Sequence, residues 1–224
     1  MSDDLVDRQA LLSSFRSRLQ GGQAAIREGY LTDGDAARLL TDRCRLIDEC
    51  LCAFWQGLKL PAALSLMAVG GYGRGELFPA SDVDLLVLLP SSPDASLTAQ
   101  LEQAIALLYD SRLDVAPSVR TVDECVQAAS GDLTIQTALL ETRLLTGSPT
   151  LYHEFVRRLQ ETIDPQAFFE AKRKEQEERH LRFHDSPYSL EPNFKEAPGG
   201  LRDLQTVLWV TRAAGYGNTW HDLA

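Results

Sequence analysis

Apolar side chains recur along this chain with two different periods, and these periods predict its secondary structure. Residues 33–57 are expected to form an amphipathic helix, because their apolar positions follow alternating steps of four and three. These positions are Leu40, Cys44, Ile47, Leu51 and Phe54. Either Asp33 or Asp35 is available as the N-cap of this helix.

Two short apolar runs predict strands. Residues 64–69 (LSLMAV) read as a buried strand that stops at a pair of glycines. Residues 83–89 (VDLLVLL) read as a second strand that ends at Pro90. Because both runs are almost continuously apolar, we expect both faces of their sheet to be covered.

Helical periodicity dominates the remainder of the chain. Apolar residues from Leu97 to Leu108 predict a helix, which leads to a third strand near residues 112–121. Residues 121–184 are expected to be helical throughout, in several pieces. Their predicted breaks lie near Gly131, at 147–149 and near 164–165.

The order of these elements predicts an α+β fold. We expect an N-terminal helical region (1–60), a small mixed-sheet core (61–145) and a C-terminal helical domain (146–224), which we expect to be truncated. A boundary near residue 145 follows from this division. The sequence contains neither an internal repeat nor a low-complexity tract.

Composition narrows the class of protein. The chain has 224 residues, of which 44% are hydrophobic and 24% are charged, and its formal net charge is −10. An acidic chain is poorly suited to the phosphate contacts that dominate nucleic-acid affinity, so we expect no nucleic-acid partner. No apolar run approaches the length of a membrane span, and the acidic N-terminus does not resemble a secretory signal. These features predict a cytoplasmic protein with no membrane contact, in which the three cysteines of one helical pattern, Cys44, Cys50 and Cys52, are reduced core residues.

Two carboxylates at the start of the second strand are the first candidates for chemistry. Asp82 and Asp84 are two residues apart, so on a strand both side chains project from the same face. Paired carboxylates repel each other unless a cation neutralises them, and Mg²⁺ prefers such oxygen ligands together with substrate phosphates. The alternative is a pair of solvated aspartates at the mouth of a strand.

A glycine-rich turn precedes these carboxylates. The segment GGYGRGE, residues 70–76, contains four glycines and one arginine. Backbone amides at Gly70 and Gly71 can approach phosphate oxygens closely, and Arg74 adds a charged donor. The segment fits neither the Walker A pattern nor the GxGxxG pattern, so we expect phosphate binding of another type. A plain tight turn is the alternative.

The glycine pair, ten intervening residues and then Asp-apolar-Asp together resemble the signature of the polymerase-beta-like nucleotidyltransferase superfamily. The resemblance implies a third carboxylate from a later strand, and Asp114 occupies the matching position. It also implies that Asp82, Asp84 and Asp114 bind Mg²⁺ in a two-metal site. From its own surroundings, Asp114 reads equally as a solvated aspartate.

Three longer blocks narrow this resemblance. GGYGRGELFPASDVDLL, SVRT and EPNFKEAPGGLRDLQTVLW, in this order, closely resemble the N-terminal part of the bifunctional uridylyltransferase/uridylyl-removing enzymes. The chain departs from that pattern at Ala116-Pro117 and at Ala197. The resemblance implies transfer of UMP from UTP to a tyrosine hydroxyl of the nitrogen-regulatory PII protein, with release of pyrophosphate. It implies no uridylyl-removing activity here, because that hydrolase domain does not fit in the chain, which we expect to be part of a longer enzyme.

Three further side chains, Ser118, Arg120 and Lys195, are candidate nucleotide ligands, and the sequence also allows a purely structural role for some of them. Ser118 and Arg120 share a strand face with Asp114 if residues 112–121 stay extended, although Pro117 could break this phase. Arg120 otherwise reads as a surface ion-pair residue. Lys195 lies in a long loop before the last helix and either closes over the nucleotide or belongs to a segment that merely initiates that helix.

Two other functions remain open from the sequence. One is an enzyme of the same fold that uses another nucleoside triphosphate or another acceptor, because no feature of the sequence determines which nucleobase is bound. The other is a nucleotide-binding regulatory module without catalysis. The three candidate carboxylates favour an enzyme over such a module.

Overall fold

The computed structural model describes residues 2–183, 191 and 193–223. The chain divides into two compact units. The first unit comprises Met1–Cys125 and Glu141–Val156, and the second comprises Val126–Leu140 and Arg157–Ala224. The boundary expected near residue 145 falls inside the first unit.

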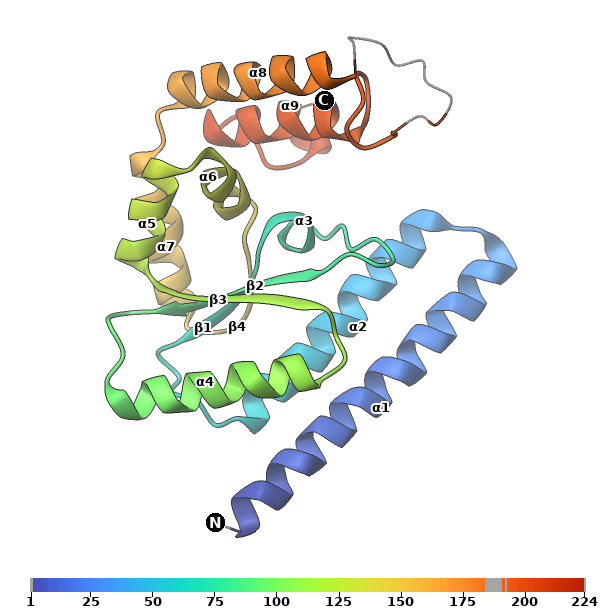
Figure 1. The fold of residues 1–224 in the computed structure, drawn as a ribbon, viewed down its shortest axis with the longest axis vertical. Helices are drawn as coiled ribbons and strands as arrows, with labels where there is room; N and C mark the ends of the chain where they lie inside the picture. Colours follow the sequence, from blue (N-terminus) through green and yellow to red (C-terminus); the bar gives the residue numbers. More distant parts are fainter. Residues whose placement is uncertain (1, 184–190, 192, 224) are drawn as a thin grey trace. The chain divides into compact units, whose positions relative to one another are not determined.

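Two long helices open the first unit. Helix α1 (Ser2–Asp33) and helix α2 (Ala36–Gly57) lie side by side as an antiparallel pair (Figure 1). The connection turns at Gly34, whose φ of 70° suits a residue without a Cβ. Of the two candidate N-caps, Asp35 caps α2, because its carboxylate accepts a hydrogen bond of 3.0 Å from the Arg38 amide.

A four-stranded mixed sheet forms the centre of the first unit. Its strands are β1 (Ser65–Ala68), β2 (Val83–Leu89), β3 (Val115–Thr121) and β4 (Arg143–Gly147), in the order β3-β2-β1-β4. Strand β1 pairs antiparallel with both β2 and β4, and β2 pairs parallel with β3. The predicted mixed sheet and its first three strands are therefore confirmed.

Strand β4 corrects the prediction that residues 121–184 are helical throughout. Residues 143–147 pair with β1, with Leu144 opposite Met67 and Arg143 opposite Ala68. Five residues with two adjacent leucines carry no period that distinguishes strand from helix. The tertiary pairing with β1 decides the structure, and Gly147, with a φ of 107°, ends the strand.

The main core lies on one face of the sheet. Helix α4 (Ala95–Asp110) connects β2 to β3, as expected for a parallel pair, and Asp94 caps it through the Leu97 amide at 2.8 Å. Buried side chains of α1, α2 and α4 form one cluster with alternate residues of β2. Phe15 and Phe54 meet edge to face within it, with ring centroids 5.6 Å apart.

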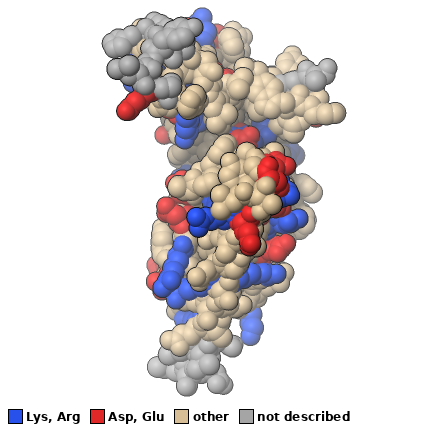
Figure 2. All heavy atoms as spheres, turned by 90° about the vertical axis from the view of Figure 1, so that its right-hand side faces the viewer, with Lys and Arg blue, Asp and Glu red and all other residues tan. Residues whose placement is uncertain are grey.

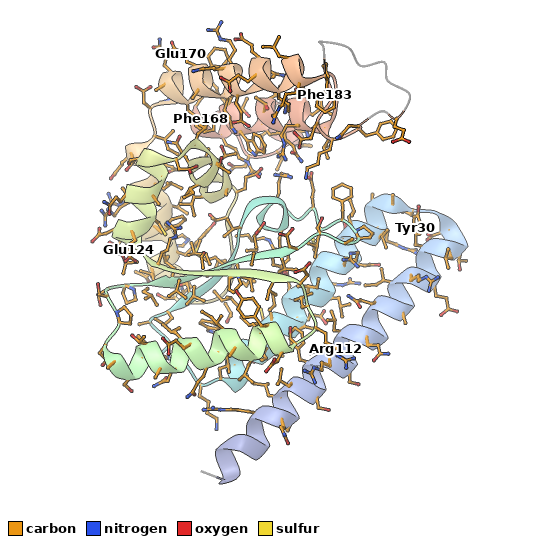
Figure 3. All side chains as sticks on the ribbon, in the orientation of Figure 1. Tyr30, Arg112, Glu124, Phe168, Glu170 and Phe183 are labelled. Carbon is orange, nitrogen blue, oxygen red and sulfur yellow. The ribbon has the colours of Figure 1, made fainter. Side chains whose placement is uncertain are left out.

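Helical segments follow β3. Helix α5 (Val122–Gly131) begins where the Glu124 carboxylate accepts hydrogen bonds from the amide and hydroxyl of Thr121, at 2.7 and 3.1 Å; Glu124 is labelled in Figure 3. Helix α6 (Leu133–Leu140) and helix α7 (Pro149–Thr162) lie on either side of β4 in the sequence. The predicted breaks near Gly131 and at 147–149 thus coincide with element ends.

The second unit contains a pair of packed helices. Helix α8 (Pro165–Arg182) starts at the predicted break and is capped by Asp164, and it packs against helix α9 (Leu201–Ala213). The ammonium of Lys172 lies 4.5 Å from the centroid of the Trp209 ring between them. A 3₁₀ helix η1 (Trp220–Leu223) ends the described chain. In the part of the chain that the structure describes, no helix combines the length and apolarity of a membrane span.

Candidate active site at the head of the second strand

The glycine-rich segment between β1 and β2 is a single helical turn, α3 (Gly70–Gly73). Gly70 has a φ of 60°, a conformation that residues with a Cβ rarely adopt, and Val69 donates a hydrogen bond of 3.1 Å to the Asp84 carbonyl. The amides of Gly73 and Arg74 donate to the carbonyls of Val69 and Gly70, at 3.1 and 3.0 Å. The turn is therefore held directly against β2.

One of the predicted carboxylates, Asp84, lies against this turn, and a second, Asp82, is its neighbour. Asp84 is the second residue of β2, and a Cβ added to Gly70 would lie 3.5 Å from its Oδ2. Asp82 lies two residues earlier and is exposed. Burial raises the pKa of Asp84, and the charge of Asp82 raises it further. Asp84 thus lies beside the glycine turn, with Asp82 as its electrostatic neighbour.

The third aspartate lies on the neighbouring strand. Asp114 immediately precedes β3, and its carbonyl accepts a hydrogen bond of 2.8 Å from the Val83 amide. The register pairs Val83 with Val115, so continuing it by one residue brings Asp114 beside Asp82. Among the described residues, no group of three or more His, Cys, Asp and Glu side chains is arranged to hold a metal ion. The three-aspartate metal site therefore stays a prediction.

Arg74 differs in position from the expected phosphate donor. Its side chain is 8% exposed, it pairs with Glu141, and its Nε donates to Glu76 at 2.9 Å. Burial by itself lowers the pKa of Arg74, but Glu141 and Glu76 outweigh that effect and raise it. Glu141 lies two residues before β4, the strand that the sequence did not reveal, so this partner of Arg74 was not foreseen. In the structure Arg74 supports the turn from inside the protein.

Ser118 and Arg120, the two candidate nucleotide ligands on β3, are both partly buried, and the Ser118 hydroxyl already has a partner within the protein. Strand β3 stays in register through Pro117, which an edge strand tolerates, so Ser118 and Arg120 share one face. The Ser118 hydroxyl donates to the Leu85 carbonyl at 3.1 Å. Arg120 lies near Cys125. Burial raises the pKa of the Cys125 thiol to about 12, although the positive charge of Arg120 lowers it in part. Their contact with a nucleotide stays a prediction.

Lys195 belongs to the second unit, and its expected contact with the nucleotide also stays a prediction. It is exposed in a compact loop, where Asn193 Oδ1 accepts hydrogen bonds from the amides of Lys195 and Glu196, at 3.1 and 2.9 Å. Gly200 is the N-cap residue of α9. Part of the long loop in the prediction, residues 185–190 and 192, lies outside the described residues, as does His184.

Sequence reasoning missed a partly buried group of polar side chains behind the turn. The Tyr72 hydroxyl donates to Asp48 Oδ1 at 2.5 Å, and Arg143 forms two hydrogen bonds to the same carboxylate, at 2.6 and 3.1 Å. A signal was present, because Asp48 follows Cys44 by four residues and so lies on the apolar face of its helix. A charged residue on that face requires a partner inside the protein.

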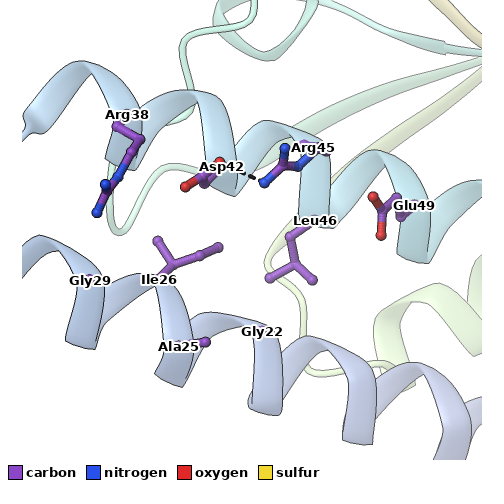
Figure 4. A pocket seen from close by; sticks show the side chains of 9 residues that line it. All are labelled: Gly22, Ala25, Ile26, Gly29, Arg38, Asp42, Arg45, Leu46 and Glu49. Atoms are coloured by element: carbon purple, nitrogen blue, oxygen red, sulfur yellow. Dashed lines mark hydrogen bonds and ion pairs between the residues drawn. The ribbon is translucent and has the colours of Figure 1, made fainter.

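A hollow between α1 and α2, shown in Figure 4, is separate from these residues. Its volume is about 490 Å³, and small residues such as Gly22 and Ala25 line one side. The charged residues on its other side have partners: Arg45 binds Asp42 at 2.7 Å and Glu49 lies 3.6 Å from Arg18. We assign this hollow to the packing of the helix pair.

Charges of both signs are mixed on the surface of the first unit. In the face shown in Figure 2, Lys and Arg side chains (blue) and Asp and Glu side chains (red) are interspersed around the middle of the view. A continuous basic stripe, the electrostatic footprint of nucleic-acid binding, is not seen on this face.

Two family models match this chain. The model described as "Nucleotidyltransferase domain" matches residues 45–145, which include α3, β2 and β3 with all three candidate aspartates. The model described as "GlnD PII-uridylyltransferase" matches residues 167–224, in the second unit.

The relatives that match this chain share one name among themselves. The chain is 49% identical over 216 residues to the bifunctional uridylyltransferase/uridylyl-removing enzyme of Aromatoleum aromaticum, covering 96% of this chain and 25% of that protein. The protein of that name from Burkholderia orbicola is 49% identical over 210 residues, with 94% and 24% covered. That from Cupriavidus pinatubonensis is 46% identical over 220 residues, with 98% and 25% covered. The chain spans about a quarter of the length of these relatives, and it belongs to the family of bifunctional uridylyltransferase/uridylyl-removing enzymes.

Proposed function

We propose that this chain carries the nucleotidyl-transfer centre of a PII uridylyltransferase. In this reaction UMP passes from UTP to a tyrosine hydroxyl of the PII protein, and pyrophosphate is released. The acceptor follows from the family description, which names PII. A protein acceptor also agrees better than a nucleic acid with the net charge of −10, and we place the reaction in the cytoplasm.

One observation carries the proposal: the Asp84 carboxylate lies against Gly70 of the glycine turn, with Asp82 as its charged neighbour. In a site for a metal-bound triphosphate, the carboxylates that bind the metal must lie close to a backbone segment that the phosphates can approach. A solvated strand mouth would not require Asp84 to be half-buried beside another carboxylate, because burial of a charged group is unfavourable.

Paired carboxylates of this kind suit a magnesium ion. Asp82 and Asp84 offer neighbouring carboxylate oxygens, and their mutual repulsion is relieved when a divalent cation binds. Asp114, beside Asp82 in the continued register, is the proposed third ligand. When bound, Mg²⁺ supplies positive charge that stabilises the phosphate oxygens during the displacement.

The chain's own residues then have separate tasks. Gly70 and Gly71 leave room for the triphosphate, and Ser118, Arg120 and Lys195 are the proposed further nucleotide contacts. The acceptor tyrosine oxygen forms a bond to the α-phosphorus of UTP while the bond from that phosphorus to the oxygen bridging to the β-phosphate breaks. Pyrophosphate leaves with that oxygen, and we assign the tyrosine proton to the carboxylate of Asp114.

Isotope transfer tests this function and its alternatives. Purified chain, PII protein and Mg²⁺ are incubated with UTP that is labelled at either the α- or the γ-phosphorus. The proposal expects the α-label on PII and the γ-label in pyrophosphate, with unlabelled UTP competing far better than ATP. Equal competition by ATP would favour another nucleotide, and nucleotide binding without any transfer would favour a regulatory module.

The role of Asp114 has its own test. Asp114→Asn is expected to reduce turnover much more than it weakens UTP binding, because the amide retains an oxygen ligand but accepts a proton poorly. Equal losses of turnover and binding would argue against a role in proton transfer.

A further inference from the structure

We propose that Asp48, Tyr72 and Arg143 form a polar anchor that positions the glycine turn for nucleotide binding. These three are positioning residues, since none lies among the candidate ligands. The inference rests on the proposed function of the turn, and it assigns a task to side chains for which neither the motif nor the family resemblance provides one.

The anchor joins three elements at one carboxylate. Tyr72 is the third residue of α3 and is 1% exposed, Asp48 lies on α2, and Arg143 begins β4. Asp48 accepts the Tyr72 hydroxyl at 2.5 Å and both terminal nitrogens of Arg143, at 2.6 and 3.1 Å. Bidentate pairing fixes the direction of the guanidinium as well as its distance.

Arg143 also contacts the turn directly. Its Nη2 donates to the Tyr72 carbonyl at 3.4 Å, and its guanidinium carbon lies 5.4 Å from the centroid of the Tyr72 ring. Arg143 therefore contacts both the main chain and the side chain of the residue that follows Gly71. A shift of the turn would disturb these contacts together.

The next residues of the turn also contact Glu141, and their amides close the same helical turn, on the carbonyls of Val69 and Gly70. A Cβ on Gly73 would lie 1.9 Å from the Glu141 carbonyl oxygen, and Arg74 pairs with the Glu141 carboxylate. The turn is thus fixed at Tyr72 by the polar anchor and at Gly73 and Arg74 by Glu141. The start of the turn is partly exposed, and its first residue, Gly70, remains next to Asp84.

The Tyr72 hydroxyl can be separated from the Tyr72 ring. The ring packs in the main core, so it stabilises the fold whether or not the hydroxyl is present. Burial raises the pKa of the phenol, and the Asp48 carboxylate raises it further, so the hydroxyl remains a donor at physiological pH. Removing only this hydroxyl leaves the Asp48–Arg143 pair intact but removes the direct hydrogen bond between the turn and Asp48.

The test compares Tyr72→Phe with Tyr152→Phe. Tyr152 is a matched control in the first unit, because its hydroxyl also donates one hydrogen bond, to the Thr142 carbonyl at 3.1 Å. We expect Tyr72→Phe to raise the KM for UTP by about tenfold while leaving the KM for PII unchanged, and Tyr152→Phe to change neither by more than about twofold. No change in Tyr72→Phe, or an equal change in both variants, would overturn the proposal.

A second readout does not depend on catalysis. Amide hydrogen exchange of Gly73 and Arg74 is measured in the metal-free chain and its variants. Tyr72→Phe should accelerate this exchange by about tenfold, and Asp48→Ala should do so too, whereas Asp48→Asn, which keeps an acceptor oxygen, should restore most of the protection. Unchanged exchange in Tyr72→Phe would refute the anchor. Accelerated exchange in a chain that transfers no label would support the anchor and reject the proposed function instead.

Discussion

The backbone of Gly73 lies so close to Glu141 that a Cβ there would be 1.9 Å from the Glu141 carbonyl oxygen. The same Cβ would lie 3.0 Å from the Ala68 carbonyl oxygen on β1. Both neighbours are backbone atoms of the sheet region, so neither can move aside as a flexible side chain would. Gly73 is therefore required by close packing, whereas Gly70 is required by its positive φ.

Gly73→Ala is expected to destabilise the chain by about 1–3 kcal/mol or more, because the added methyl group forces backbone displacement. Gly21→Ala is the control, because Gly21 lies within α1 and an added Cβ there meets no atom within 4 Å. That change should be neutral or stabilising by up to about 1 kcal/mol, since alanine favours a helix over glycine. Urea unfolding followed by circular dichroism measures both, and similar midpoints would contradict the packing argument.

Asp84→Asn is expected to raise the melting temperature of the metal-free chain. The substitution removes a half-buried charge whose pKa is raised by burial and by Asp82, so the repulsion between the carboxylates disappears. Mg²⁺ with a non-hydrolysable UTP analogue should then stabilise the wild type, by about 2.7 kcal/mol at a hundredfold excess over Kd, but not the variant. Equal stabilisation of both would show that Asp84 is not a ligand.

Asp203 should make the second unit sensitive to acid. Its Oδ2 accepts a hydrogen bond of 2.7 Å from the Gly199 amide, and His180 Nε2 lies 3.0 Å from both oxygens. Burial by itself raises the pKa of Asp203, but hydrogen bonds, including those from Gly199 and His180, and the charge of Arg179 lower it overall.

A lowered folded pKa means that this stabilisation is present above the unfolded value of about 3.9 and is lost as the pH falls through the folded value. Asp203→Asn should therefore be less stable than the wild type at pH 7, and the difference should shrink below about pH 4. Glu178→Gln, at an exposed position of α8, is the control and should change stability by no more than about 0.5 kcal/mol. A constant difference between wild type and Asp203→Asn across this range would contradict the argument.

Substitutions at Lys172 can separate the effect of its buried charge on stability from the effect of its buried side-chain volume. Its side chain is 4% exposed, its ammonium binds Glu175 at 2.8 Å, and burial lowers its pKa. Lys172→Met keeps most of the packing against Trp209 without the charge, so it should be neutral or stabilising. Lys172→Ala should cost about 2 kcal/mol or more, because it leaves a cavity beside the ring. Similar losses in both variants would show that the charge itself stabilises this helix pair.

Much of this fold could be predicted from the sequence because its signals are local. The range predicted for β2, residues 83–89, matches the structure, since an apolar run bounded by Asp82 and Pro90 has clear limits. The predicted helix that follows it also forms, because Asp94 provides a cap and apolar residues keep one helical period. Strand β4 escaped prediction because its pairing with β1 joins residues about 80 positions apart, and no local pattern records such a contact.

In the candidate site too, the features with a local sequence signal could be predicted, and those that depend on contacts between distant residues could not. The spacing of Asp82 and Asp84 predicted that they would be neighbours at the start of a strand, and the structure places Asp84 in β2 beside Gly70, with Asp82 just before that strand. The position of Arg74 could not, because its partner Glu141 is 67 residues away in the sequence. Arg74 reads as a free cation in a flexible turn until β4 brings that carboxylate next to it.

The central claim is that Asp82 and Asp84 form the metal-binding part of a nucleotidyltransferase centre. Its most direct test is the rate of label transfer from α-labelled UTP to PII under single-turnover conditions, in the wild type and in the Asp82→Ala, Asp84→Ala double variant. Glu102→Gln, at an exposed position on α4, is the control for loss of a carboxylate elsewhere. The account predicts a loss of about a thousandfold or more in the double variant and none in the control. Transfer by the double variant within about tenfold of the wild type would contradict it.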